Sequence, residues 1–184
     1  MKRLFDLTSA LLIGIPTIPI IIIAALMIYL DDLQNPIFAQ KRLGKDQKHF
    51  TLYKLRTMYV GTKSTTSHNV SASSVTKIGS FLRKTKLDEL PQLLNVIRGD
   101  MSLVGPRPGL TTDVKLTTAR EAHNIFSLLP GITGISQIEN IDMSDPDKLA
   151  LSDRVYLEQK SLGLDLKIII KTVLGRGQGD KIKK

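Results

Sequence analysis

Residues 9–30 read SALLIGIPTIPIIIIAALMIYL, a run of 22 residues without a charge. As a straight α-helix this run extends about 33 Å at roughly 1.5 Å per residue, which is close to the ~30 Å hydrocarbon core of a bilayer. A secretory signal peptide is a weaker interpretation, because the run is long and no small-x-small cleavage site precedes Asp31. The run therefore predicts a membrane-inserted helix over residues 1–32.

Two prolines, Pro16 and Pro19, interrupt the middle of this run. Each removes an amide donor and clashes with the carbonyl four residues earlier, so the helix is expected to kink or break there. Basic residues lie on both sides of the run, at Lys2, Arg3, Lys41, Arg42, Lys45 and Lys48. A kinked, re-entrant helix keeps both basic flanks in the cytoplasm, whereas a straight span strands one of them outside. The residues alone leave both topologies open.

The remainder of the chain is one small basic unit. With 184 residues it suits a single domain, and no later segment is long enough to span a membrane, which excludes a multi-span transporter. The absence of cysteine excludes disulfides and thiol nucleophiles. Residues 1–32 hold two basic and three acidic residues of the total, so the rest holds 24 basic and 14 acidic, a net +10. This charge predicts an anionic partner, and the scarcity of aromatic residues argues against single-stranded nucleic acid.

Sequence patterns predict a few short elements in this basic unit. Residues 36–58 are expected to form extended pieces around a turn at Gly44, residues 60–76 a Ser/Thr-rich mobile loop, and residues 130–134 a tight turn. Helices are expected over 146–160 and 164–174, and the Gly-rich tail from residue 175 is expected to fray. Apolar residues in 164–174 could rest on a membrane surface or pack in an ordinary core, and both readings stay open.

The chemistry is concentrated in residues 78–108, IGSFLRKTKLDELPQLLNVIRGDMSLVGPRP. Apolar residues follow the Asp88–Glu89 pair at helical spacing, and Pro91 is tolerated only in a first turn, which places Asp88 at or near a helix start. Free backbone amides and the helix dipole keep a carboxylate ionised there, as a nucleophile or metal ligand must be. An aspartate at a helix start is more often an ordinary cap, however, and on local pattern alone the cap is favoured.

Cations surround the acidic pair. Arg83, Lys84 and Lys86 precede it, and Arg107 follows on a loop stiffened by prolines on both sides. An arginine fork suits phosphate oxygens, so carboxylates among fixed cations are suited to phosphoryl transfer. The competing interpretation is a solvated basic face beside a membrane, which fits Lys84 and Lys86. The histidines, His49, His68 and His123, are too scattered for a metal site, and there is no nucleotide-triphosphatase P-loop.

Over nearly its whole length the chain resembles the bacterial sugar transferases, or monotopic phosphoglycosyl transferases. The segments that carry the resemblance are KRLFDL at 2–7, the two prolines at 16 and 19, PIFAQKRLG at 36–44, YKLRTM at 53–58, LRKTKLDELPQLLNVIRGDMSLVGPRP at 82–108, and PGITG with Gln137 at 130–137. The long block is the most specific of them. The resemblance implies an α+β, predominantly helical fold, with a re-entrant membrane helix kinked at Pro16 and Pro19 and a small catalytic domain over 33–184. Interfacial amphipathic helices and a few short strands would complete that domain, on the cytoplasmic face of the inner membrane.

The resemblance also implies a two-step reaction. An aspartate attacks the sugar-linked phosphate of a UDP-sugar, UMP leaves, and the phosphosugar passes from the enzyme to undecaprenyl phosphate. Asp88 matches the nucleophile, and Glu89 matches the acidic neighbour associated with Mg²⁺. Residues that match basic or neighbouring positions near the phosphates are Lys54, Arg56, Arg83, Arg107 and Pro108.

The chain also departs from the family pattern. Ile18, rather than serine, precedes Pro19, and residues 129–142 lack the tryptophan and cations usual after the PGITG turn. No sugar contact is assigned to 129–142 for that reason. An N-acetylated amino sugar is expected only at the family level, a nucleic-acid partner is not expected, and a homo-oligomer stays open. A non-catalytic basic scaffold at the membrane and a hydrolase of nucleotide sugars are the alternative functions.

Overall fold

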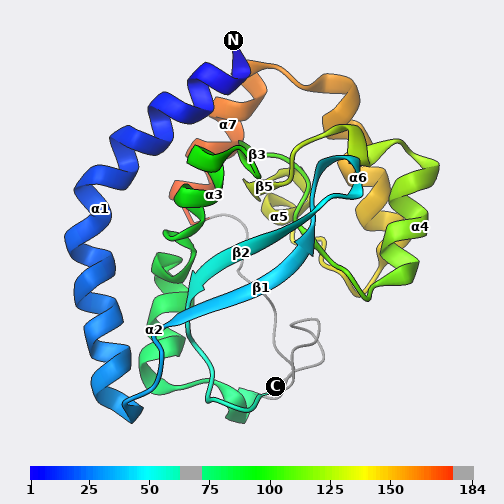
Figure 1. Ribbon diagram of the computed structural model, residues 1–184. Coiled ribbons are helices and arrows are strands. Elements are labelled where there is room, and N and C mark those ends of the chain that lie inside the picture. Colours follow the sequence, from blue (N-terminus) through cyan, green and yellow to red (C-terminus); the bar gives the residue numbers. More distant parts are fainter. Residues whose placement is uncertain (63–71, 176–184) are drawn as a thin grey trace.

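The computed structural model describes residues 1–62 and 72–175 and consists mostly of helices with two small sheets (Figure 1). The central part of the loop expected over 60–76, His68 and nearly all of the expected C-terminal tail lie outside these described residues. The helices are α1 (Lys2–Asp32), α2 (Lys77–Thr85), α3 (Gln92–Arg98), α4 (Val114–Ala122), α5 (Ile135–Ile138), α6 (Pro146–Gln159) and α7 (Leu162–Val173). The strands are β1 (Ile37–Leu43), β2 (His49–Leu55), β3 (Ser102–Val104), β4 (Gly109–Leu110) and β5 (Gly131–Thr133). Short 3₁₀ turns are η1 (Lys45–Gln47), η3 (Ala72–Ser74), η4 (Leu87–Glu89) and η5 (Ile125–Ser127).

Helix α1 continues without interruption through both of its prolines. Thr17, which lies between them, donates its hydroxyl to the carbonyls of Ile13 at 2.9 Å and Gly14 at 3.0 Å. A hydroxyl that bonds back to the preceding turn supplies a donor near the missing proline amides and favours bending over breakage. Figure 1 shows α1 as one curved helix along the side of the molecule. The expected break is therefore absent, and the helix accommodates its prolines by curving.

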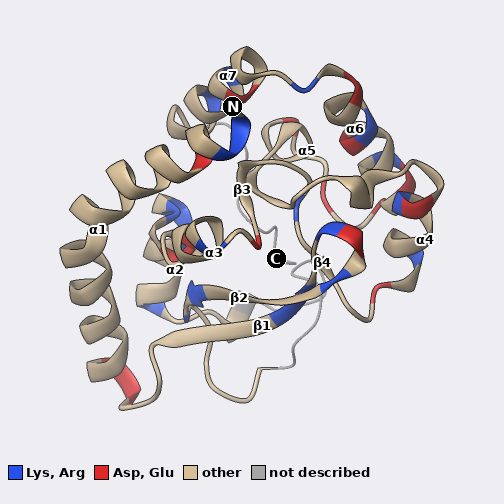
Figure 2. Ribbon diagram, turned by 45° about the horizontal axis from the view of Figure 1, so that its top comes forward, with Lys and Arg blue, Asp and Glu red and all other residues tan. Residues whose placement is uncertain are grey.

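The buried residues of α1 lie toward its two ends. In its most apolar 18-residue window, 11% of the residues are buried, so α1 is not a core helix. The buried residues are Asp6 and Ala10 near the start and Ala24 and Ile28 near the end. Figure 2 shows that charged residues on α1 occur only at these ends. An apolar, exposed middle between two packed ends is the surface expected of a helix that lies in lipid.

Polar contacts hold both ends of α1. At the start, Lys2 pairs with Asp165 of α7 at 2.7 Å, and the Arg3 guanidinium donates to the carbonyls of Val96 and Ile97 at 2.5 and 2.9 Å. The other end is held by Asp32 and Arg56, as described with the site below. Both ends of the membrane-type helix are thus attached to one folded unit.

The two sheets agree with one sequence prediction and correct another. Strands β1 and β2 form an antiparallel hairpin, from Ile37 opposite Leu55 to Leu43 opposite His49, and β4 pairs with the other edge of β1. This confirms the extended pieces predicted over 36–58. The tight turn predicted over 130–134 is wrong, because Gly131–Thr133 forms β5, which pairs in parallel with β3. A Cβ on Gly131 would lie 2.1 Å from the amide nitrogen of Gly105, so glycine is needed there for close backbone approach rather than for a turn.

The main core lies where α1, α3, β3, α6 and α7 meet, and its buried apolar residues include Ala10, Leu93, Val96, Met101 and Ile168. A buried polar network crosses it: Asp6 of α1 accepts from the Ser102 hydroxyl at 2.9 Å, and the Tyr156 hydroxyl donates to Asp165 at 2.7 Å. Burial, reinforced by Asp165, raises the pKa of Tyr156 far above its ordinary value, so the phenol stays protonated. Helices α6 and α7 confirm the helices predicted over 146–160 and 164–174.

Candidate active site

Asp88 lies in a tight turn between two helices. Helix α2 ends at Lys86, which has a left-handed backbone (φ 58°), and Leu87–Glu89 then form η4. The N-cap residue of α3 is Pro91, whose side chain makes no capping hydrogen bond. Asp88 therefore lies just before the helix start, as predicted. The residue is buried, with 7% of its surface exposed.

Glu89, the second member of the pair, lies between two cations. The Lys54 ammonium of β2 is 2.8 Å from Glu89 Oε1, and the Arg107 guanidinium is 3.9 Å from the same oxygen. All three side chains are largely buried, with relative exposures of 15–17%. Ion pairs at this depth are screened less by solvent than surface pairs are, so the three groups form a fixed charged cluster. The fold thus brings Lys54 and Arg107, two of the residues expected near the phosphates, to Glu89.

The loop that carries Arg107 is fixed by a buried ion pair as well as by its prolines. The Arg120 guanidinium donates to the Arg107 carbonyl at 2.8 Å and to the Asp153 carboxylate at 2.9 and 2.7 Å. Burial raises the pKa of Asp153, and the charge of Arg120 opposes that effect. The Pro108 carbonyl accepts from Arg42 of β1 at 3.1 Å. Nothing in the sequence pattern distinguished Arg120 or Asp153, because their roles depend on contact between α4 and α6.

Two predicted phosphate-binding arginines have other contacts. Arg56 binds Asp32 with both guanidinium ends at 2.6 Å and donates from Nε to the Asn35 carbonyl at 2.8 Å. Arg56 therefore holds the end of α1, and the phosphate contact expected of it stays a prediction. Arg83 remains a candidate, with one guanidinium nitrogen 3.3 Å from the Thr57 hydroxyl.

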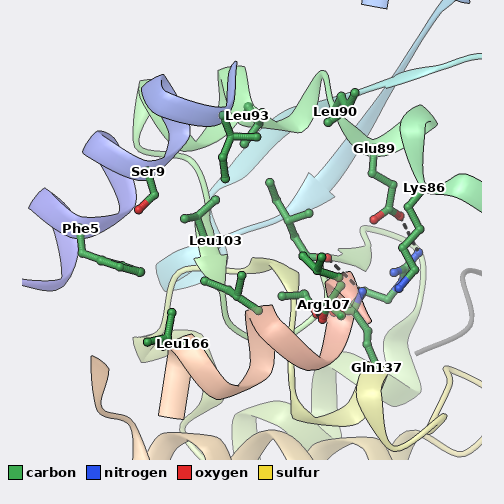
Figure 3. A pocket seen from close by; sticks show the side chains of 16 residues that line it. Phe5, Ser9, Lys86, Glu89, Leu90, Leu93, Leu103, Arg107, Gln137 and Leu166 are labelled. Carbon is green, nitrogen blue, oxygen red and sulfur yellow. Dashed lines mark hydrogen bonds and ion pairs between the residues drawn. The ribbon is translucent and has the colours of Figure 1, made fainter. Parts of the chain in front are cut away.

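A cavity of about 370 Å³ borders the charged cluster. Lys86, Glu89, Arg107 and Gln137 lie at one end of it, and Phe5, Ser9 and Leu166 lie toward the other (Figure 3). Between the two ends the walls are mainly aliphatic and come from α3, β3, β5 and α7. The cavity therefore has a charged end beside the acidic pair and an apolar remainder that extends toward α1.

Lys86 corrects a second sequence interpretation. It was expected on a solvated basic face, but it is half-buried and lines the charged end of the cavity (Figure 3). Burial lowers the pKa of Lys86, Glu89 opposes this shift, and the nearby Arg107 adds to it. Lys84 is exposed, as expected. The left-handed helix end that turns Lys86 inward is not evident in the sequence.

The acidic pair suits one kind of metal site and not another. Within residues 1–62 and 72–175, no group of three or more histidine, aspartate or glutamate side chains could hold a metal ion. Mg²⁺ is commonly bound by only one or two carboxylates, and substrate phosphates and water complete its shell. Asp88 and Glu89 fit that second arrangement, in which the ion arrives with a phosphorylated substrate. His49 is exposed and His123 lies at the end of α4, so neither belongs to the cluster.

Comparisons with known proteins agree on one family. A model of the family described as bacterial sugar transferase matches residues 1–177. The chain is 41% identical over 173 residues to the uncharacterized sugar transferase EpsL of Bacillus subtilis, which covers 94% of this chain and 85% of that protein. It is 36% identical over 181 residues to a UDP-glucose:undecaprenyl-phosphate glucose-1-phosphate transferase of Caulobacter vibrioides, covering 94% and 68%.

Other relatives are longer than this chain. An undecaprenyl-phosphate glucose phosphotransferase of Komagataeibacter xylinus is 36% identical over 185 residues, covering 94% of this chain but 35% of the relative. The chain thus spans only about a third of the length of some of the relatives that it matches. The shared part nevertheless includes α1, the acidic pair and the cavity, since the match of the family model extends from residue 1 to residue 177.

Proposed function

Because the chain belongs to the bacterial sugar transferase family, we propose that it transfers a phosphosugar from a UDP-sugar to undecaprenyl phosphate and releases UMP. Two relatives are named as transferases that act on undecaprenyl phosphate, and one of these names includes UDP-glucose as donor. The names of the relatives include different sugars, so they do not indicate which sugar this chain accepts. An N-acetylated amino sugar remains our family-level expectation.

The observation that carries this proposal is the placement of the acidic pair. Asp88 is buried just before the start of α3, and its neighbour Glu89 is held between Lys54 and Arg107. A non-catalytic basic scaffold has no need of a buried aspartate beside a fixed cluster of opposite charges. In phosphoryl transfer, by contrast, cations neutralise the charge that develops on the phosphate oxygens, and a carboxylate serves as nucleophile.

The first step consumes the donor. An Asp88 carboxylate oxygen attacks the phosphorus that bears the sugar, and a new P–O bond forms between enzyme and phosphosugar. The bond from that phosphorus to the bridging oxygen breaks, and UMP leaves with the electron pair. Arg107 and Lys54 lie where they can stabilise the negative oxygens, and no proton transfer is needed for the charges to balance.

The second step consumes the acceptor. An oxygen of undecaprenyl phosphate attacks the same phosphorus, a diphosphate bond forms, and the Asp88 carboxylate is released unchanged. The ion that we propose, Mg²⁺, would be held by Glu89 and supplies charge neutralisation when it is bound.

We further propose that α1 is re-entrant, with the catalytic unit on the cytoplasmic face of the inner membrane. The contacts that support this place both ends of α1 on the same folded unit, through Lys2, Arg3 and Asp32. A straight span would carry one end of the helix to the opposite face of the bilayer. The curvature of α1 around its prolines is in keeping with the same topology.

The test is the variant Asp88→Asn, assayed with a panel of UDP-sugars in the presence and absence of undecaprenyl phosphate. We expect loss of both UMP and lipid-linked product, while the variant stays membrane-bound, because the amide is a poor nucleophile. Asp147→Asn, an exposed aspartate in the first turn of α6, is the matched control and should keep its activity.

Near-normal UMP release by Asp88→Asn would remove Asp88 as the nucleophile. Release of sugar phosphate by the unsubstituted protein without a lipid acceptor would favour the hydrolase. If no UDP-sugar is consumed and the protein binds only anionic vesicles in a salt-sensitive way, the scaffold is favoured.

A further inference from the structure

The cavity beside the acidic pair has two chemically different ends. Lys86, Glu89 and Arg107 form the charged end, and Phe5, Ser9 and Leu166 lie at the apolar end (Figure 3). The aliphatic wall between these ends is continuous along α7, which contributes Leu166, Ile169 and Val173. Such a cavity matches a ligand that is anionic at one end and a hydrocarbon along the rest of its length.

Of the two substrates in the proposed reaction, only the acceptor has this shape. A UDP-sugar is polar at both ends, and burying its sugar or uracil among aliphatic side chains would leave their polar groups without hydrogen-bond partners. The position of the apolar end supports the same choice. It reaches α1, whose middle is apolar and exposed, so a long hydrocarbon chain could leave the cavity directly into lipid.

We infer that this cavity is the acceptor subsite, which holds the isoprene units nearest the phosphate between α1 and α7. The inference rests on the proposed function and deepens it. In this arrangement the lipid phosphate lies near Lys86 and Arg107, within reach of the phosphosugar on Asp88. The first isoprene units extend past Leu103 toward Ser9 and Leu166, and the remainder of the chain lies in the bilayer.

Two substitutions on opposite walls test this arrangement. Ser9→Phe adds an aromatic ring to the α1 wall, and Leu166→Trp enlarges the α7 wall, so each should fill part of the cavity without adding a charge. Ile170→Trp is the matched control. Ile170 is on the same helix as Leu166 and is similarly exposed, at 49% compared with 51%, but it does not line the cavity. Two independent walls keep the test valid if one variant fails to fold, which thermal unfolding of each purified variant will show.

The assay measures KM for a series of prenyl phosphates with one, two, three and eleven isoprene units. For the unsubstituted protein, we expect KM to fall steeply over the first units and then level off once the cavity is filled. For Ser9→Phe and Leu166→Trp, we expect KM for the acceptors to rise about tenfold, equivalent to roughly two fewer buried methylene groups. The KM for the UDP-sugar should change less than twofold in every variant, and Ile170→Trp should match the unsubstituted protein throughout.

Unchanged acceptor KM in both folded wall variants would overturn the inference, as would an equal rise in Ile170→Trp. An acceptor KM that does not depend on the number of isoprene units would also overturn it. These failures differ from failure of the proposed function, in which the unsubstituted protein would make no lipid-linked product from any acceptor. A rise in the KM for the UDP-sugar instead would assign the cavity to the donor.

Discussion

Glu89 shows how much of this site depends on a single side chain. Its carboxylate is the common partner of Lys54 and Arg107, which come from a strand and from a proline-rich loop. Substitution of Glu89 therefore affects two cations at once, in addition to any metal ion that it holds. Asp88 has a different character, because its role in the proposed reaction is to form and break one bond.

The variant Glu89→Gln should separate these roles. We expect the rate to fall by roughly 10–100-fold, with a weaker response to Mg²⁺, because the amide neither neutralises the cations nor binds the ion as strongly. The measurement is initial rate against Mg²⁺ concentration, with the exposed Glu121→Gln as control. An unchanged Mg²⁺ response would remove Glu89 from the metal site.

We expect Lys86 to make the activity sensitive to alkaline pH. Burial and Arg107 lower the pKa of Lys86, although Glu89 opposes them, so as pH rises this lysine loses its charge before an exposed lysine does. If its charge helps to hold the acceptor phosphate, acceptor affinity should fall on the alkaline side earlier than expected for an ordinary lysine. Arginine stays protonated throughout that range.

We therefore expect Lys86→Arg to shift the alkaline limb of the profile of kcat/KM for the acceptor to higher pH. The exposed Lys84→Arg is the matched control and should leave the limb in place. An identical limb in Lys86→Arg would mean that another group causes it.

At the scale of elements, α1 is the unusual member of the fold. Its ends are fixed by ion pairs and backbone contacts, and its middle presents apolar side chains outward. The Asp32–Arg56 pair fixes the point where α1 meets the strand hairpin. Because Arg56 uses both ends of its guanidinium on one carboxylate, lysine cannot reproduce the contact.

Arg56→Lys should lower the free energy of unfolding by about 1–2 kcal/mol, because two charge-assisted hydrogen bonds are replaced by at most one. Thermal or denaturant unfolding in detergent measures this loss. Arg154→Lys, in the exposed Arg154–Glu158 pair, is the control and should change stability by less than about 0.5 kcal/mol. Equal effects of the two substitutions would show that the Asp32–Arg56 pair does not fix α1.

At the scale of the whole molecule, the Arg120–Asp153 pair joins stability to the active site. It lies between α4 and α6, almost fully buried, and Arg120 also binds the carbonyl of Arg107. Removing one member of a buried pair leaves the other charge without compensation, whereas replacing both with apolar residues can be nearly neutral.

Arg120→Met should therefore lower the free energy of unfolding by ~3–5 kcal/mol, and Arg120→Met with Asp153→Leu should recover most of that loss. In the single variant, the charge of Arg120 no longer opposes the effect of burial, so the pKa of Asp153 should rise further. The variant should therefore lose less stability at low pH, where Asp153 is protonated, than at neutral pH. Unfolding at several pH values measures both effects.

Activity should not follow stability in this pair. In the double variant, the Arg107 carbonyl still lacks its donor, so we expect kcat to stay low even where folding is restored. Recovery of kcat together with stability would mean that Arg120 serves the core alone and does not position Arg107.

The sequence by itself predicted the membrane-type helix, the strand hairpin and helices α6 and α7, and it singled out the acidic pair and Arg107 as candidates for the site. These features follow from local composition and periodicity, or from contiguous motifs such as GPRP, and such signals need no knowledge of distant contacts. Glu89 and Lys54 meet because β2 passes beside η4, and the family pattern had already marked both residues.

Only the tertiary structure decided the rest, because the deciding contacts join residues far apart in the chain. Arg56 matched a phosphate-binding position in the sequence, and only the fold showed that it pairs with Asp32 at the end of α1. Lys86 has a left-handed backbone at the C-terminal end of α2, which the sequence does not indicate. Gly131 lies in a strand whose backbone packs closely against that of Gly105. The cavity itself has no sequence signature, since its walls come from seven separate helices, turns and strands, which the folded chain brings together.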